Sequence, residues 1–469
     1  MGETKRLVKN TVIIAIGNLS TKVISFFLLP MYTSLLSTSD YGISDLFITI
    51  AAFLTPFITM LMEESLMRFL IDAGEDKKRQ TSVISTALCI CMIGSIIFII
   101  LSALILNIIH YEYTTFFIFF VLANAITMVV NPMLRGMGRT KTYALYNFIM
   151  SASVIILNVL FIAVFRWGLK GLLSSTIIAY IGCSLFMLIK INIFQFFKIN
   201  MLSKEISKAM ISYAIPLIPN KLSWSIINFS SRMVIFGYMG ESANGLYAVS
   251  NKFPSLMDTF YGFFYMSWKE SSARALLSGE TNEFYNKVYK YLRGLLLSLV
   301  IVMVAAMPIA YMILINPNFY ESIYCVPILM IAMYFANISG FYGGIFTAYK
   351  QTKIMGTTTM VSAAINIILN IALIWKFGLY AAAFSTLIAN VVTAEYRRRK
   401  VRKYIILNED VRTYISFAVT CAIVLVLFYS NNIYCWILNI IIGLLYALLT
   451  NIDLIKIVLK ELGKLDKRK

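Results

Sequence analysis

Long apolar segments alternate with short polar breaks along the whole chain. The apolar segments run for roughly 20–28 residues, which is the length that an α-helix needs to cross a bilayer. This pattern predicts an all-α integral membrane protein with about fourteen membrane-spanning helices. Their approximate bounds are 11–36, 42–70, 81–106, 115–134, 142–165, 171–189, 210–237, 244–267, 291–315, 322–348, 354–375, 379–396, 413–430 and 434–455.

Composition agrees with a membrane protein. Hydrophobic residues make up 59% of the chain and charged residues 13%, whereas soluble domains carry about 25% charged residues. The net charge of +19 would also suit a nucleic-acid-binding protein. Because the basic residues lie in loops that flank the apolar segments, orientation in the membrane explains them better, and no nucleic-acid partner is expected.

The basic residues divide unequally between the two sides of the membrane. The breaks on the side of both termini hold most of the Lys and Arg, whereas those on the other side hold only Arg166, Lys170 and Lys376. Basic loops stay in the cytoplasm. The division therefore predicts a multi-pass protein with both termini in the cytoplasm, which requires an even number of spans.

The two halves of the chain resemble each other. Residues 155–158 and 367–370 both read Ile-Ile-Leu-Asn, and Tyr41-Gly42 aligns with Asn244-Gly245. Chance similarity between apolar helices is the alternative explanation. The repeat predicts two parallel six-helix lobes around a central cavity, where transporters commonly bind their substrate. The expected domains are an N-terminal lobe (1–189), a cytoplasmic linker (190–209), a C-terminal lobe (210–400), and an extra helix pair with a basic tail (401–469).

Charged residues inside the predicted spans gather in the first two spans of each half. Each costs about 2.5–3.5 kcal/mol at mid-bilayer, so such residues usually face a wet cavity or a partner. Lys221, Asn228 and Arg232 recur at helical spacing on one face. A cavity lined by cations favours an anionic substrate such as a phosphate. The candidate substrate-binding residues are Asn18, Lys22, Arg68, Lys221, Asn228, Arg232 and Lys252.

Acidic residues in the same spans are candidates for coupling to a Na⁺ or H⁺ gradient: Asp45, Glu63 and Asp258. For several of these charged residues, a purely structural role stays open as the alternative to substrate binding or ion coupling. Arg68 could pair with Glu64 on the helix surface or extend toward the interface, and Asp45 could cap a helix near its outer end. Arg232 and Lys252 could pair with Asp258.

Other chemistry is weakly represented. Cys89 and Cys91 lie in a span without a nearby His, which disfavours a metal site, and the chain has no Gly-rich phosphate-binding motif. The outer loops are too short for the catalytic loops of a membrane glycosyltransferase. We therefore expect no enzyme activity and no cofactor apart from a coupling ion.

The chain resembles polysaccharide-export flippases of the Wzx type. The resemblance rests on loose motifs spread over nearly the whole chain: Gly17-Asn18-Leu19, Lys22, residues 27–33, Tyr41-Gly42, Asp45, Gly245-Leu246-Tyr247, Lys252, Asn370, Gly378-Leu379 and Ala381-Ala382-Ala383. It implies membership of the multidrug/oligosaccharidyl-lipid/polysaccharide exporter superfamily.

The resemblance also implies a function. The expected substrate is an undecaprenyl-pyrophosphate-linked oligosaccharide, such as an O-antigen or capsule repeat unit, flipped across the bacterial cytoplasmic membrane by alternating access. Membrane lipids, a polysaccharide polymerase and glycosyltransferases are the implied partners. A lipid II flippase would want a similar cationic cavity and is the alternative. A cation-coupled multidrug antiporter would need an acidic cavity, and the mostly basic residues deep in the predicted spans disfavour this function.

Overall fold

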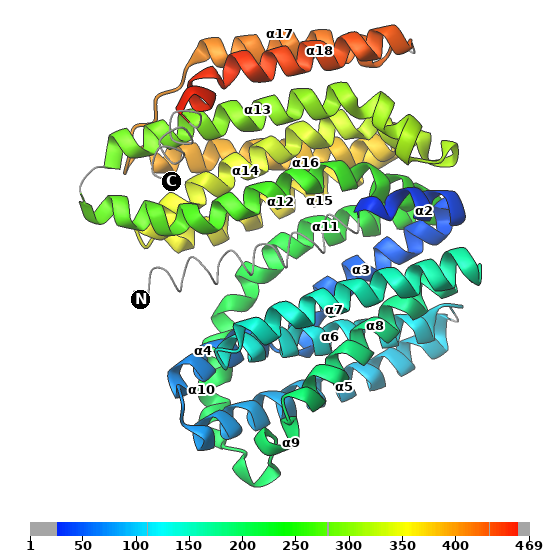
Figure 1. Ribbon diagram of the computed structural model, residues 1–469, viewed down its shortest axis with the longest axis vertical. Coiled ribbons are helices and arrows are strands. Elements are labelled where there is room, and N and C mark those ends of the chain that lie inside the picture. Colours follow the sequence, from blue (N-terminus) through cyan, green and yellow to red (C-terminus); the bar gives the residue numbers. More distant parts are fainter. Residues whose placement is uncertain (1–25, 110, 279–280, 431, 458–469) are drawn as a thin grey trace, which may run out of the picture. The chain divides into compact units, whose positions relative to one another are not determined.

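The computed structural model describes residues 26–109, 111–278, 281–430 and 432–457, and every regular element in these ranges is helical (Figure 1). The predicted all-α membrane class is confirmed. Ten described helices are long and apolar enough to cross a membrane, fewer than the fourteen predicted spans. Most of the first predicted span, 11–36, lies outside the described residues. Helices α11 (Ile218–Met239), α12 (Glu241–Ser278) and α16 (Leu379–Val401) occupy three further spans but are more polar than the ten.

The chain forms two compact units, and the first comprises Met1–Phe236 with Gly240–Gly245. Besides most of α11, its long helices are α3 (Thr38–Ile58), α4 (Met62–Ala73), α5 (Lys77–Ile109), α6 (Thr114–Gly136), α7 (Thr140–Asn158), α8 (Gly168–Lys190) and α10 (Lys204–Ala214). The shorter elements are α2 (Leu29–Leu35), α9 (Ile193–Phe196), a π-helical turn at Val159–Val164, and 3₁₀ turns at Ile199–Met201 and Ile215–Leu217.

Helix α4 supplies the centre of the first unit's core. Leu66 and Leu70 are fully buried in a cluster with Met133 of α6, Met187 of α8 and Met210 of α10. The amphipathic pattern of α4 accounts for this burial, because its apolar positions recur at helical spacing. Glu64 and Arg68 stay exposed, whereas the polar Glu63 and Ser65 are buried.

The predicted span 42–70 is not one helix, and this expectation was wrong. Met60 and Leu61 adopt left-handed conformations with φ of 51° and 52°, which separate α3 from α4. The turn closes through a hydrogen bond from the Leu61 amide to the Pro56 carbonyl at 3.2 Å. The left-handed conformation costs each non-glycine residue ~1–3 kcal/mol, so the packing around Met60 and Leu61 must stabilise it.

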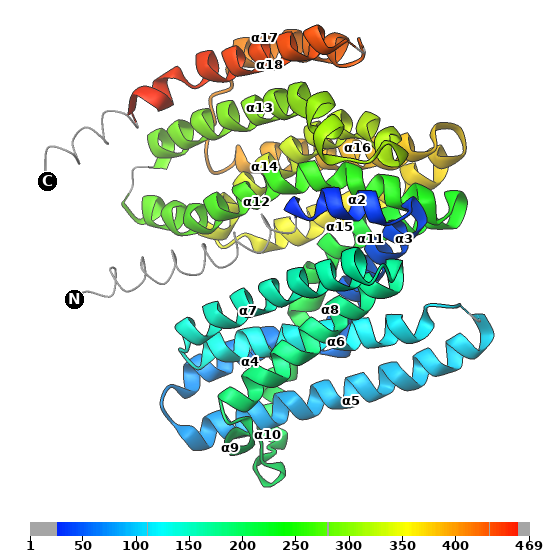
Figure 2. The ribbon, with the colours of Figure 1, turned by 45° about the vertical axis from the view of Figure 1, so that its right-hand side comes forward.

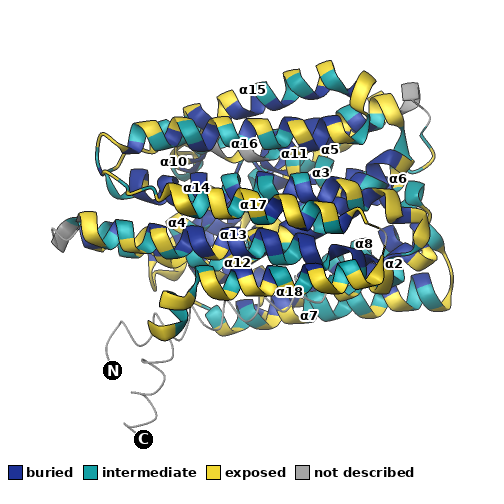
Figure 3. Ribbon diagram, turned by 90° about the horizontal axis from the view of Figure 1, so that it is seen from above, coloured by how far each residue is buried: buried dark blue, intermediate teal, exposed yellow. Residues whose placement is uncertain are grey.

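The second unit comprises Gly237–Met239 and Leu246–Lys469. Its helices after α12 are α13 (Thr281–Leu314), α14 (Val326–Ala348), α15 (Thr352–Phe377), α16, α17 (Val411–Phe428) and α18 (Ile433–Thr450), with a 3₁₀ segment at Pro317–Cys325. Helix α16 packs against both α14 and α15, and the pair α17–α18 packs on α13 (Figure 2). Few residues of α17 and α18 are buried (Figure 3), as expected for helices that face lipid.

A buried arginine joins three helices of the second unit. Arg397 of α16 is 1% exposed. Its guanidinium donates to the hydroxyls of Thr358 and Thr359 on α15 and to the carbonyl oxygen of Ser339 on α14, at 2.9, 2.9 and 3.0 Å. All its hydrogen-bond partners among the described residues are neutral oxygens, so the charge is stabilised by dipoles rather than by a carboxylate.

The units divide at residues 236–246, one helix later than the linker 190–209 at which the sequence was divided. That linker lies within the first unit and contacts α5: Ser82 and Ser85 donate to the carbonyl oxygens of Met201 and Phe196. Helix α11 joins the first unit through side chains, including a stacked pair of Phe229 with Phe53 at 4.3 Å between ring centroids.

Two glycines let α3 and the first turn of α12 cross with their backbones in contact. A Cβ on Gly42 would collide with the Glu241 carbonyl oxygen, and one on Gly245 would collide with that of Thr38. The Asn244 side chain donates to the Gly42 carbonyl oxygen at 2.8 Å. Gly42 and Gly245 belong to the pairs Tyr41-Gly42 and Asn244-Gly245, which occupy equivalent positions in the sequence repeat. Residues at equivalent positions of the repeat therefore contact each other at this crossing.

We expect Gly42→Ala to lower the thermal stability of the purified protein. The added methyl group has no space, and overpacking of this kind costs ~1–3 kcal/mol. Gly182→Ala is the matched control, since Gly182 lies in α8 with open space around it. Unfolding followed by intrinsic fluorescence in detergent measures both variants. Equal melting temperatures for the two would contradict the crossing.

Candidate functional site

An ion pair joins the N-terminal part of α3 to the C-terminal part of α11. Arg232 Nε contacts Asp45 Oδ2 at 2.5 Å, and the two side chains are 11% and 13% exposed. Arg232 Nη1 also reaches the Asn228 carbonyl oxygen at 3.5 Å. Because both charges lie away from bulk water, removing either one would leave the other buried.

Asp45 does not cap α3, which was the structural alternative left open by the sequence. The N-terminus of α3 is capped by Ser37, whose side chain accepts from the Asp40 amide, while Asp40 accepts in return from the Ser37 amide. Asp45 lies further along the helix and pairs with Arg232. Within the first unit, Arg232 thus has Asp45 as an ion-pair partner.

A second ion pair joins α4 and α11 near the break between α3 and α4. Lys221 Nζ lies 3.4 Å from Glu64 Oε1, and the side chains are 47% and 46% exposed. This pair is open to solvent, so it contributes little to stability and leaves both groups accessible to a ligand. Asn228, two turns along α11, is also exposed.

Glu63 points the other way, into the first unit. It is 7% exposed and accepts a hydrogen bond from the Thr59 hydroxyl at 2.8 Å. Thr59 is the last residue before the left-handed turn. No described cation lies within salt-bridge distance of Glu63, so the turn holds a buried carboxyl group beside the exposed Lys221–Glu64 pair.

The remaining predicted residues are dispersed. Arg68 pairs with Asp72 at 3.4 Å and is 56% exposed, which is a helix-surface pair, although the partner is not Glu64. In the second unit, Lys252 is half-buried and Asp258 is exposed on α12. Asn18 and Lys22 lie outside the described residues. The binding and coupling roles of all these residues stay predictions.

No group of three or more His, Cys, Asp or Glu side chains among the described residues could hold a metal ion. Cys91 is buried and contacts the Thr59 carbonyl oxygen at 3.9 Å. The polar chemistry of this region therefore consists of carboxyl, amino, guanidinium and amide groups.

The predicted span 379–396 ends one residue before Arg397, which placed Arg397 in a cytoplasmic loop, whereas the structure buries it in α16. The signal was present in α16, where Ser385, Ala389, Thr393 and Arg397 are all buried and lie four residues apart. Continuing this helical face into the basic run would have separated Arg397 from its exposed neighbours. Glu64 was noted but not assigned a site role, since its partner lies 157 residues away.

Comparison with known proteins gives a family and a fold. A family model described as "Polysaccharide biosynthesis protein" matches residues 7–268. No curated protein matches the chain.

Solved structures of two transporter groups resemble the chain. The lipid II flippase MurJ in an inward closed conformation is 15% identical, covering 95% of this chain and 100% of that chain with a TM-score of 0.69. An inward-facing multidrug resistance MATE family transporter of the MOP superfamily is 16% identical, covering 83% and 98% with a TM-score of 0.68. A MOP superfamily transporter from Pyrococcus furiosus is 16% identical, covering 84% and 94% with a TM-score of 0.57.

We expect the two ion pairs to respond differently to loss of one partner. Asp45→Asn leaves Arg232 buried without its counter-charge and should destabilise the protein by ~3–5 kcal/mol. Glu64→Gln removes a solvent-exposed partner and should cost no more than about 1 kcal/mol. Unfolding of the purified variants in detergent provides the measurement.

The double variant Asp45→Asn/Arg232→Gln tests whether the loss of stability in Asp45→Asn comes from the unpaired Arg232 charge. It removes both charges, so it should be more stable than Asp45→Asn alone. If Asp45→Asn and Glu64→Gln were equally stable, the buried pair would not have the structural role assigned to it.

Proposed function

Because the chain belongs to the polysaccharide biosynthesis protein family and has the fold of MOP-superfamily transporters, we propose that it flips lipid-linked oligosaccharides. The proposed substrate is an undecaprenyl-pyrophosphate-linked sugar repeat unit, such as one of an O-antigen or capsule. It moves from the inner to the outer leaflet of the bacterial cytoplasmic membrane.

The observation that carries this proposal is the polar face of α11 in the first unit. Lys221 and Asn228 are exposed in a region that the hydropathy pattern places within the membrane. Exposure of a charged side chain to lipid tails is costly, so such a face must be in contact with water or a polar ligand. A pyrophosphate needs this environment to cross the bilayer.

The chemistry of the two ends of α11 differs in a way that suits transport. At the outer end Arg232 is neutralised by Asp45, which leaves little net attraction for an anion. Near the helix break, Lys221 is accessible and paired only with the exposed Glu64. A pyrophosphate can replace Glu64 as the partner of Lys221 through charge-assisted hydrogen bonds, and Lys22 and Lys252 would add further positive charge.

Alternating access is the proposed mechanism, with the sugar and pyrophosphate in the polar region and the isoprenoid chain in the bilayer. Glu63 and Asp258 are the proposed sites of coupling to H⁺ or Na⁺. Glu63 supports this role by its burial beside the break between α3 and α4, because broken membrane helices commonly bind coupling ions. We propose no enzymatic step, and the polymerase and glycosyltransferases that handle the same lipid are the proposed partners.

Transport in proteoliposomes tests the substrate-binding role. We expect the double variant Lys22→Ala/Lys221→Ala to lower the initial rate of translocation of lipid-linked oligosaccharide roughly tenfold or more, because each lost charge-assisted bond is worth ~1.5–3 kcal/mol. Lys376→Ala is the matched control, as Lys376 is exposed at the end of α15.

Undiminished transport by the folded double variant would contradict the cationic site. Including lipid II as a competitor tests the alternative substrate. Inhibition by lipid II at concentrations below those of the oligosaccharide lipid would favour the lipid II flippase over the repeat-unit flippase.

The proposed orientation predicts which residues can be labelled from outside the cell. In intact cells, Lys376→Cys should react with a membrane-impermeant maleimide, whereas Arg402→Cys should react only after permeabilisation. The described natural cysteines are buried or half-buried, and the unaltered chain serves as the control. The opposite labelling pattern would reverse the termini.

A further inference from the structure

A cavity of about 990 Å³ opens in the second unit at the ends of α13, α17 and α18. It is lined by the Asn282–Gly294 stretch of α13, by residues 406–410 of the connection from α16 to α17, and by Thr413 and Thr450. The distribution of basic residues places this region on the proposed cytoplasmic side. It contains none of the residues assigned to transport.

Arg293 forms part of the cavity wall and is 3% exposed. Its guanidinium lies between the rings of Tyr289 and Tyr414, at 5.4 and 5.2 Å from their centroids. Its Nε and Nη1 have no hydrogen-bond acceptor among the described residues, and no described carboxylate lies within 4 Å. Leaving a buried charged donor unsatisfied costs ~1–3 kcal/mol or more.

Arg397, another buried arginine in the second unit, has a full set of hydrogen-bond acceptors. All three of its side-chain nitrogens donate to protein oxygens: Nε to Thr358, Nη1 to Ser339, and Nη2 to Met355 and Thr359. Arg293 differs: it has a hydrogen bond with Tyr414, but its Nε and Nη1 lack acceptors among the described residues, so these two donors are available to a bound ligand.

Most other charges at the cavity already have partners. Lys290 Nζ binds Asp453 at 2.9 Å, and Glu409 accepts from Arg398 at 2.7 Å. Asp410 caps α17, and the hydrogen bond from the Thr413 hydroxyl is the main cause that lowers the pKa of Asp410. Lys287 and Glu283 form no ion pair within 4 Å among the described residues, and the Asp410 carboxylate interacts electrostatically with Arg293.

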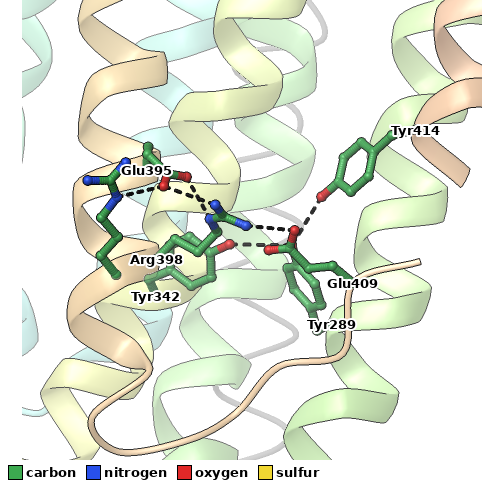
Figure 4. Close-up of polar contacts among 7 residues, drawn as sticks. Tyr289, Tyr342, Glu395, Arg398, Glu409 and Tyr414 are labelled. Atoms are coloured by element: carbon green, nitrogen blue, oxygen red, sulfur yellow. Dashed lines mark hydrogen bonds and ion pairs between the residues drawn. The ribbon is translucent and has the colours of Figure 1, made fainter. Parts of the chain in front are cut away.

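Figure 4 shows a polar network of tyrosines, Glu395, Arg398 and Glu409, which includes the Tyr289 and Tyr414 rings that flank Arg293. The hydroxyl of Tyr289 contacts those of Tyr342 and Tyr414, each at 3.3 Å. Arg398 bridges Glu395 on its own helix and Glu409 on the connection. These contacts hold α13, α14, α16 and α17 in place, so the cavity is a preformed feature rather than a gap between mobile loops.

We propose that this cavity binds a phosphate group, with Arg293 and Lys287 as its cationic ligands. Guanidinium groups hold phosphate oxygens through paired N–H donors. Lys287 adds a second positive charge six residues earlier on α13. The phosphate can belong to an anionic lipid headgroup at the membrane surface or to a soluble compound. Binding would fix the helix pair α17–α18 against α13, and it does not depend on the transported substrate.

Binding to the full-length protein tests the proposal in two arms. The first titrates the protein in neutral detergent with inorganic phosphate, against chloride at equal ionic strength, and follows the melting temperature. The second reconstitutes it in nanodiscs of phosphatidylcholine with or without phosphatidylglycerol and counts retained lipids by native mass spectrometry. The variants are Arg293→Lys, Arg293→Gln and Lys287→Gln. Arg274→Gln is the control, because Arg274 is exposed on α12 and paired with Glu270.

We expect the wild type and Arg274→Gln to bind at least one of the two probes, and Lys287→Gln and Arg293→Lys to weaken that binding roughly tenfold. Stabilisation by inorganic phosphate identifies a soluble ligand, and retention of phosphatidylglycerol alone identifies a lipid headgroup. No binding by the wild type, or equal binding by Lys287→Gln, overturns the proposal. Lys287 is exposed, so this variant remains decisive even if Arg293→Gln fails to fold.

Discussion

The structure depends on one constraint: a charge removed from water must find a compensating group nearby. The described residues meet it in three ways. Arg232 and Asp45 neutralise each other across α3 and α11. Arg397 is surrounded by neutral oxygens of α14 and α15. Lys221 stays at the surface and keeps only a weak, exposed partner. The degree of compensation therefore distinguishes structural charges from those available to a ligand.

The same constraint applies to the backbone. Within a membrane the peptide groups must bond internally, which favours helices throughout, and close contact between helices then requires small residues. Gly42 and Gly245 provide it where α3 meets the start of α12. The break at Met60 and Leu61 is an exception to continuous helix, and it lies beside the buried Glu63 and the exposed Lys221–Glu64 pair. The irregular backbone thus coincides with the polar region proposed for transport.

The second unit combines a similar helical scaffold with a different polar end. Its tyrosine and arginine network ties the connection between α16 and α17 to the bundle. A phosphate ligand there would act on the extra helix pair, whereas the substrate proposed for α11 lies in the first unit. The proposed transport and the proposed phosphate binding consequently rest on different residues, and each proposal can fail without the other.

Hydropathy and charge placement were sufficient to predict the all-α membrane class and the positions of most long helices, because these properties are local or additive along the chain. The family resemblance rested instead on short sequence motifs. Periodicity also placed Lys221, Asn228 and Arg232 on one helix but could not tell which of them would be exposed. That difference depends on Asp45, which lies 187 residues from Arg232. The sequence by itself determined where the charges are, and the tertiary structure decided which are neutralised, since pairing depends on how helices distant in sequence cross.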